Sequence, residues 1–388
     1  MHSKPLEGLR VLDLTRLLPG PLATQHLADH GAEVIKIEDT GAGDYARSMG
    51  PMHGESSYFF QVVNRNKRSL NLDLKQDRGR ELFLRLAATA DVLVEGFRPG
   101  VMHKLGLDYE TVARANPRIV YCSISGYGQN GPFALRAGHD INYIGYAGVL
   151  DQTGTAGGAP AIPNLQIGDL LGGTLCSLVG MLIAIIDARA TGSGRHVDIA
   201  MSDGVLAHAI FPLLEVLSRG AVRPRGDDLL TGGVPCYGVY ETADGRHMAV
   251  GALEAKFWHA VCDTLGRADL KAVHVATGEE GARAKALVAD IFRARTQAEW
   301  IALFDGVDCC VTPVLTLEES LENAQVQARG MVTDVGGVRQ FAAPFGLSGL
   351  APEAWTPAPG AGADSDDLLG QLGLTPDEIV ALRRTGVI

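Results

Sequence analysis

The first 200 residues alternate short apolar runs with segments in which apolar positions recur every three or four residues. Short apolar runs are typical of buried strands, and the longer spacing is typical of amphipathic helices. The predicted strands span residues 9–14, 33–38, 91–95, 119–125 and 195–200, and the predicted helices span 21–30, 78–88, 109–116 and 170–189. Strands that alternate with helices favour a parallel sheet covered by helices, so this half predicts a Rossmann-like α/β large domain.

The pattern changes after residue 225. Runs at 237–242 and 247–251 flank Ala243-Asp244-Gly245 and predict a β-hairpin. Predicted helices at 255–265, 281–294 and 297–304 and a strand at 310–315 follow. This part of the chain therefore predicts a smaller α+β domain.

The C-terminal part contains a connection rich in Pro and Gly near 343–364 and then a capped helix at 375–384. Thr375 is the expected N-cap, Pro376 the first helical residue, and Glu378 completes a capping box. We therefore divide the chain into a large α/β domain at 1–200, a linker helix at 201–228, a small α+β domain at 229–325, and a segment at 326–388 that returns to the large domain.

Charge and cysteine content narrow the class of protein. With 34 basic and 45 acidic residues the net charge is −11, which gives no overall attraction to nucleic acid or to an anionic membrane. The six cysteines show no metal-ligand spacing, and no signal peptide begins the chain, so we expect a reduced cytoplasmic protein without a metal. The apolar run 170–186 fits a buried core helix better than a membrane span.

Two features bear on a nucleotide ligand. The turn after the first strand, residues 15–21, lacks the GxGxxG pattern, so we expect no nicotinamide cofactor. Basic residues gather at predicted strand ends and loops, where they could hold a polyanion such as coenzyme A, although such residues are more often solvated surface charges. They are Lys36, Arg47, Arg65, Lys67, Arg68, Lys75, Arg98 and Lys104.

Segments along nearly the whole chain resemble family III CoA-transferases, a superfamily that includes 2-methylacyl-CoA racemases. They are PLEGLRVLDL at 5–14, PGP at 19–21, LADHGAEVIKIE at 27–38, NRNKRSL at 64–70, LDLK at 72–75, EGFRPG at 95–100, GYG at 126–128 with GP at 131–132, and CVTPV at 310–314. The resemblance implies an acyl-CoA ligand on the α/β domain, no cofactor beyond the CoA of the substrate, and a homodimer whose two chains interlock.

The resemblance also implies which residues bind CoA. The positions that match CoA contacts, together with two in the histidine motif described next, are Leu72, Lys75, Phe97, Arg98, Lys104, Gly138 and Tyr143. Racemases tend to carry an arginine where this chain has Asp39, and we expect Lys36 or Arg47 to replace it.

Two branches of the superfamily use the same aspartate differently. In the transferase branch the residue matching Asp169 is a nucleophile that forms a mixed anhydride. In the racemase branch it is an acid/base, joined by a histidine in a GHDINY motif, here His139, and by a glutamate after the small-domain hairpin, here Glu254. Both racemase signatures are present, so we expect a racemase of fatty acid (lipid) metabolism. The segment 40–60 resembles transferases, which keeps that activity as the alternative.

The chemistry of inversion suits these residue types. A proton must leave one face of the α-carbon and another must return to the opposite face, so two acid/base groups are needed. Histidine titrates near neutrality, an aspartate must be shifted upward by burial, and backbone N–H groups after Asp169 could hold the enolate oxygen. Glu254 could orient the imidazolium. Taken singly, Asp169 is typical of an N-cap, His139 of a helix start, and Glu254 of a solvated carboxylate.

Overall fold

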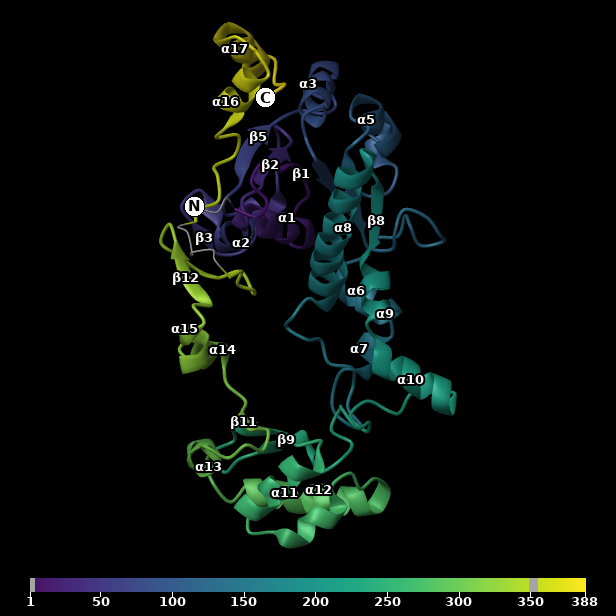
Figure 1. The fold of residues 1–388 in the computed structure, drawn as a ribbon, viewed down its shortest axis with the longest axis vertical. Coiled ribbons are helices and arrows are strands. Elements are labelled where there is room, and N and C mark those ends of the chain that lie inside the picture. The colour runs from purple at the N-terminus through teal and green to yellow at the C-terminus, as the bar shows by residue number, and fades with distance from the viewer. Residues whose placement is uncertain (1–3, 349–354) are drawn as a thin grey trace. The chain divides into compact units, whose positions relative to one another are not determined.

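The computed structural model describes residues 4–348 and 355–388, and the chain forms two compact units (Figure 1). The α/β unit comprises Met1–Ala147, Asn164–His208 and Gln325–Ile388, and the α+β unit comprises Gly148–Pro163 and Ala209–Ala324. The predicted boundaries put residues 148–163 in the large domain, whereas the structure groups them with the α+β unit. The predicted linker helix at 201–228 is two helices, one in each unit, α9 (Met201–Ala207) and α10 (Ile210–Arg219).

The α/β unit is built on a six-stranded parallel sheet in the order β5-β2-β1-β6-β7-β8, which confirms the predicted α/β class. The strands are β1 (Arg10–Leu14), β2 (Glu33–Glu38), β5 (Arg68–Asn71), β6 (Val92–Glu95), β7 (Val120–Ser125) and β8 (His196–Ala200). The sequence did not predict β5, because its four residues, RSLN, lack an apolar run. It is nevertheless an edge strand in register with β2, with Arg68 opposite Ile35.

Helices cover both faces of this sheet. On one face Leu27 of α1 (Pro19–Asp29) and Met181 of α8 (Cys176–Thr191) pack against strand residues such as Val94. On the other face α3 (Asp77–Ala87) and α5 (Tyr109–Ala115) join the C-terminal helices α16 (Ser365–Gln371) and α17 (Pro376–Arg384). The predicted capping box of α17 is present.

Shorter elements complete the α/β unit. They are a 3-10 turn at Tyr45–Ser48, β3 (Met52–His53), β4 (Ser56–Ser57), α2 (Tyr58–Val63), α4 (Val101–Lys104), α6 (Asp140–Tyr146), a π-helical segment at Gly168–Leu175, β12 (Val332–Val335) and β13 (Val338–Phe341). The predicted connection near 343–364 falls partly outside the described residues.

The α+β unit contains the predicted hairpin. Strands β9 (Tyr237–Glu241) and β10 (His247–Gly251) pair antiparallel, and β11 (Val311–Pro313) pairs on the far side of β10. Helices α11 (Ala255–Thr264), α12 (Gly278–Phe292) and α13 (Gln297–Phe304) enclose a core that includes Trp258 and Trp300. The remaining elements are α7 (Val149–Gln152), a 3-10 turn at Ala268–Val273, and α14 (Leu317–Leu321); α15 (Ala324–Ala328) lies at the boundary between the units.

The predicted core helix has one buried face. In the described chain Gly168–Thr191 is long and apolar enough to meet the length and composition of a membrane span, a test that core helices of globular proteins also pass. Leu178, Met181 and Ile185 are buried against the sheet. The opposite side, with Val179, Ile183 and Ile186, is exposed in the single chain.

Candidate active site

The order of strands in the α/β unit marks one place for a ligand. The chain passes from β1 to β2 on one side and later to β6 on the other, so the strand order reverses between β1 and β6. Ligands of open α/β sheets bind outside the carboxyl ends of the strands at such a reversal. Here the loops after β1 and β6 meet, because the guanidinium of Arg16 lies 5.4 Å from the ring centre of Phe97.

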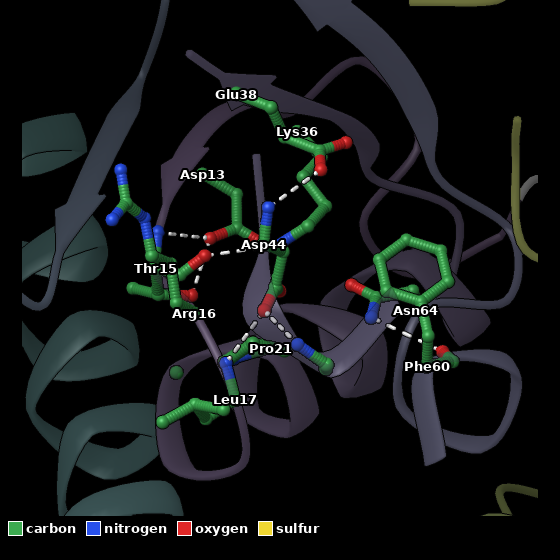
Figure 2. Close-up of polar contacts among 12 residues, drawn as sticks. Asp13, Thr15, Arg16, Leu17, Pro21, Lys36, Glu38, Asp44, Phe60 and Asn64 are labelled. Atoms are coloured by element: carbon green, nitrogen blue, oxygen red, sulfur yellow. Dashed lines mark hydrogen bonds and ion pairs between the residues drawn. The ribbon is translucent and has the colours of Figure 1, made fainter. Parts of the chain in front are cut away.

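Buried charges support the loop after β1 (Figure 2). Lys36 Nζ lies 2.7 Å from Asp44 Oδ2, and both side chains are fully buried. Lys36 also donates to the carbonyl oxygen of Thr15 at 2.9 Å, and Asp44 Oδ1 accepts the Leu17 N–H at 3.0 Å. Leu17 has φ 64°, a strained value for a residue with a side chain, so these contacts hold a conformation that the loop would not adopt alone.

A second buried pair lies beside the first. Lys67 Nζ contacts Asp13 Oδ2 at 2.9 Å, again with both side chains fully buried. Burial by itself would raise the pKa of Asp13, but the charges of Lys67 and Lys36 outweigh it and hold that pKa far below its usual range. Burial lowers the pKa of Lys67 to about 8. Asp13, Lys36, Asp44 and Lys67 thus form a cluster of buried charges on and beside β1 and β2, which we call the scaffold.

The predicted set of basic residues therefore separates into two groups. The first group is paired inside the protein. Besides Lys36 and Lys67, it contains Arg47 with Glu38, Arg65 with Asp29, and Arg68 with Glu33 and Asp364. We expected Lys36 or Arg47 to contact CoA in place of an arginine at position 39. The geometry does not favour this, because Lys36 is ion-paired with Asp44 and Arg47 with Glu38.

The second group is free to meet a ligand. Lys75, Arg98 and Lys104 are exposed, and within residues 4–348 and 355–388 none of them forms an ion pair. Phe97 is half-buried beside Arg98, whereas Leu72 is buried and donates its N–H to the Glu38 carbonyl oxygen at 2.8 Å. Four of the positions that the resemblance assigned to CoA are thus accessible to a ligand: Lys75, Phe97, Arg98 and Lys104.

Arg16 is a cation of this region that the sequence did not single out. Its Nη2 donates to Asp39 Oδ2 at 2.8 Å, and its Nη1 donates to the Tyr45 hydroxyl at 3.1 Å. The unusual Asp39 thus faces an arginine from the neighbouring loop. A basic residue in a first turn that lacks the GxGxxG pattern was the signal that could have drawn attention to it.

A second group of predicted residues meets around α6. Asp140, the first residue of that helix, accepts the Asp169 N–H on Oδ1 at 3.0 Å and so joins the histidine motif to the aspartate. His139 is exposed at the N-cap of α6, and its N–H donates to Asn142 Oδ1 at 3.0 Å. The Tyr143 hydroxyl donates to the Gly138 carbonyl oxygen at 2.5 Å.

Asp169 has the electrostatic character that an acid/base needs. Its pKa is raised to about 6, mainly by burial and in addition by the negative charge of Asp140, whereas the charge of His139 acts to lower it. His139 is therefore close enough to Asp169 for their charges to interact. Both belong to the α/β unit, so this arrangement is internal to one compact body.

The backbone around Asp169 differs from the prediction. Asp169 is not an N-cap, since it lies inside the π-helical segment Gly168–Leu175. The Asp169 N–H is taken by Asp140, and the Leu170 N–H donates to the Gln166 carbonyl oxygen at 2.8 Å. The Leu170 N–H, one of the groups expected to hold the enolate oxygen, is thus already hydrogen-bonded, and the role expected for the N–H groups after it stays a prediction.

Glycines allow this segment to pack closely. A Cβ added at Gly172 would lie 2.1 Å from the Met201 carbonyl oxygen, and one at Gly173 would lie 2.6 Å from Pro19 Cβ. Single π-helical turns often occur at functional sites, where they move one side chain out of the regular helical position. The glycines of the sequence GDLLGG at 168–173 indicate close packing. They do not indicate that the segment is π-helical.

Glu254 belongs to the α+β unit. It is exposed at the N-cap of α11, and its backbone carbonyl oxygen accepts the Phe257 N–H at 3.0 Å. Its side chain does not cap the helix. The role expected for Glu254 stays a prediction.

Comparisons with known proteins agree in family and differ in the reaction named. A human protein named alpha-methylacyl-CoA racemase is 37% identical over 385 residues, which cover 99% of this chain and 97% of the relative. An Acetobacter aceti protein named acetyl-CoA:oxalate CoA-transferase is 35% identical, over 89% of this chain and 90% of its own length. A solved structure of a CAIB/BAIF family protein from Brucella suis has a TM-score of 0.84 at 30% identity, covering 96% of this chain and 100% of that one.

The match to the family as a whole spans most of the chain. The family profile described as CoA-transferase family III matches residues 6–365. The relatives named above from human and Acetobacter aceti are both enzymes, one a racemase and one a transferase. Because the family profile matches most of the chain and both relatives are enzymes, the chain is an enzyme that belongs to CoA-transferase family III.

Proposed function

We propose that this enzyme is a racemase that inverts the α-carbon of 2-methylacyl-CoA thioesters. The observation that carries the proposal is that Asp169, whose pKa is raised to about 6, lies within the electrostatic influence of His139 and is hydrogen-bonded to Asp140, the residue after that histidine. Two groups that can each hold or release a proton near neutral pH are what inversion requires. The 37% identity to a protein named alpha-methylacyl-CoA racemase supports the same reaction.

The proposed reaction moves one proton off the α-carbon and one proton onto it. One of the two side chains takes the α-proton, and the electron pair of the broken C–H bond becomes an enolate with its charge on the thioester oxygen. The other side chain then gives its proton to the opposite face. The thioester stays intact, so neither an acceptor acid nor a cofactor is needed.

Binding of the CoA nucleotide is proposed at the reversal point between β1 and β6. Lys75, Arg98 and Lys104 supply unpaired positive charge for the phosphates, and Phe97 supplies an aromatic surface. Gly138 and Tyr143 bring the histidine motif to the same carboxyl edge of the sheet. Arg16 adds a cation on the opposite loop, held by Asp39, which accounts for the aspartate at a position where racemases tend to have an arginine.

The alternative is a CoA-transferase in which Asp169 is the nucleophile. Two observations favour it, the 35% identity to an acetyl-CoA:oxalate CoA-transferase and the transferase-like segment 40–60, whose Asp44 and Tyr45 contact the loop after β1. In that reaction Asp169 attacks the thioester to form an anhydride, CoA leaves, and an acceptor acid then takes the place of the first acid.

A single incubation separates the two reactions. A racemase given (S)-2-methylacyl-CoA in heavy water should incorporate deuterium at the α-carbon while the substrate loses optical purity. A transferase should instead require a second acid and should form an anhydride on Asp169 that hydroxylamine traps. CoA transfer without α-deuterium would reject the racemase and leave the family and CoA site standing.

We also propose that the enzyme works as an interlocked homodimer. Helix α10 has no buried residue, although Phe211, Leu214 and Leu217 are among its apolar side chains, and α8 exposes an apolar side as well. Apolar surface of this extent is usually covered by a partner, here a second copy.

Mixed refolding of inactive His139→Ala and Glu254→Ala proteins should restore part of the activity if one site draws these residues from two chains. Monomers in light scattering at micromolar concentration would refute the dimer.

A further inference from the structure

A buried carboxyl group lies next to the proposed CoA loop and has no part in the chemistry above. Glu95 ends β6, is only 4% exposed, and precedes the loop that carries Phe97 and Arg98. In the sheet it lies opposite Ser123 of β7, which lies opposite Asp198 of β8. Residues in register on neighbouring parallel strands face the same side, so the three form a polar row at the carboxyl edge.

The contacts of Glu95 are specific. Its Oε2 accepts the Phe97 N–H at 2.8 Å, which closes the turn from the strand into the loop. Ser123 also hydrogen-bonds to the carboxyl group, and the Ser123 hydroxyl lies 3.0 Å from His196 Nε2. A loop that begins on such a buried acceptor is positioned by it, because an unpaired Phe97 N–H would have to find another partner.

The surroundings of Glu95 contain no compensating cation. The titratable groups that act on it or are acted on by it are Asp198, Tyr121 and Cys122, and His196 lies beyond Ser123. In the described part of the chain no lysine or arginine forms an ion pair with it. The pKa of Glu95 is raised to about 7. Burial is the main cause, the hydrogen bonds from Ser123 and Phe97 act to lower the pKa, and the charge of Asp198 acts to raise it.

We propose that Glu95 is a positioning residue that holds the Phe97–Arg98 loop for the CoA nucleotide, and that its charge sets the affinity of this loop for that anionic ligand. This inference rests on the proposed CoA binding at the loop. Either form of the carboxyl group can accept the Phe97 N–H. The ionised form also places a negative charge directly under a loop that must bind phosphates.

The direction of the effect follows from linkage. A bound polyanion makes ionisation of Glu95 less favourable, so CoA binding raises the pKa of Glu95 and draws in a proton. Affinity is therefore highest where Glu95 is protonated and falls as the pH rises through neutrality. Glu95→Gln keeps an acceptor for the Phe97 N–H but removes the charge, whereas Glu95→Ala removes both.

The test is the dissociation constant of free CoA, measured by calorimetry with the full chain between about pH 6 and 8.5, a range centred on the neutral region where a buried carboxyl group can titrate. CoA titrates in this range too, so the ratio of wild type to Glu95→Gln at each pH cancels the ligand's own contribution. Wild type should lose roughly tenfold more affinity than Glu95→Gln across the range, which corresponds to one pKa unit of coupling. Glu95→Ala should bind several-fold more weakly than Glu95→Gln at every pH, if its melting temperature shows that it folds.

Two results would overturn the inference. Equal pH dependence in wild type and Glu95→Gln would remove the charge effect, and equal affinity of the Gln and Ala variants would remove the positioning role. If Glu95→Ala does not fold, the comparison with Glu95→Gln still decides the charge effect. Arg98→Ala is the control for the proposed CoA site. Weaker CoA binding in that variant together with no effect of Glu95→Gln rejects this inference alone, whereas no CoA binding by wild type rejects the proposed function as well.

Discussion

Two regions at the carboxyl edge of the same sheet bury carboxyl groups in opposite surroundings. Under β1 and β2, Asp13 faces Lys67 and Lys36, which hold its pKa far below the usual range even though burial acts to raise it. Near β6 and α6, Glu95 and Asp169 have no lysine or arginine ion pair within the described residues, and burial raises their pKa values to about 7 and about 6. Burial alone thus does not decide what a carboxylate does; its counter-charge does.

The buried charges that have counter-ions and the buried carboxyl groups that lack them have different roles. Asp13 and Lys67 are predominantly charged at neutral pH, because the pKa of Asp13 lies far below its usual range and that of Lys67 is about 8. Beside them, Asp44 holds the strained Leu17 loop in place. The uncompensated groups can gain and lose a proton in the working range of an enzyme, which is the property that functional sites share. Four experiments would break or sharpen this comparison.

The largest effect is expected at Asp169. Asp169→Asn keeps the shape of the side chain but cannot accept a proton, so racemisation should fall by roughly 10²–10⁴-fold, the usual worth of a general acid/base. His139→Ala should have a similar cost. The measurement is loss of optical purity of (S)-2-methylacyl-CoA. A mild effect of His139→Ala with a complete loss in Asp169→Asn would instead fit the transferase, in which His139 is a bystander.

Removing a charge from the scaffold should lower the free energy of unfolding. Lys67→Met leaves Asp13 buried without its nearest counter-charge, which should lower the free energy of unfolding by about 3–5 kcal/mol. Lys75→Met is the matched control, because Lys75 is exposed and unpaired in the described chain, and it should change that energy by less than about 0.5 kcal/mol. Urea unfolding at fixed protein concentration measures both. Equal losses in the two variants would contradict the division into fixed and free cations.

The free cations should respond in binding. Arg98→Ala and Lys75→Ala each remove a charge-assisted contact to the CoA nucleotide, so KM should rise about tenfold, while kcat falls less because the contact is the same throughout the reaction. Arg78→Ala is a control on the same unit, since Arg78 is occupied by Glu81 on its own helix. An unchanged KM in both test variants would exclude Arg98 and Lys75 from the site.

Comparison of sequence and structure shows where patterns are informative. The strands at 33–38 and 247–251 and the capped C-terminal helix were predictable, because burial and capping leave local signatures in spacing and residue type. Strand β5 was missed, because an edge strand needs no apolar run when its neighbour supplies the hydrogen bonds. The π-helical form of Gly168–Leu175 was missed because this segment packs against Met201 and Pro19, which are distant in sequence and become its neighbours only in the fold.

The same limit applies to the candidate site. Spacing brought Lys36, Arg47, Arg98 and Lys104 together as one set of cations, since a sequence does not tell a buried pair from an exposed charge. The contacts of the Leu17 N–H with Asp44 and of Arg16 with Asp39 join the loops after β1 and β2, which only the strand order places side by side. Asp140 was visible in the histidine motif, but its hydrogen bond to the Asp169 N–H was not.

The smallest effect is expected in the pH dependence of stability. The pKa of Asp169 is about 6 in the folded protein and near its ordinary value of 3.8 once unfolded, so the folded state holds the proton more tightly. The resulting stabilisation is fully present below the unfolded pKa and is lost as the pH rises through the folded one.

A shift of two units corresponds to about 3 kcal/mol, and partial exposure of the carboxyl group should reduce this to about 1–2 kcal/mol. Wild type should therefore lose that much stability relative to Asp169→Asn between about pH 4 and 7, with half of the loss complete at about pH 5, midway between the unfolded and folded pKa values. Urea unfolding of both proteins across the range measures it, and the subtraction cancels every other titrating group. A flat difference would mean that the pKa of Asp169 is the same in the folded and unfolded states, and the contrast between the two regions would then rest on Glu95 alone.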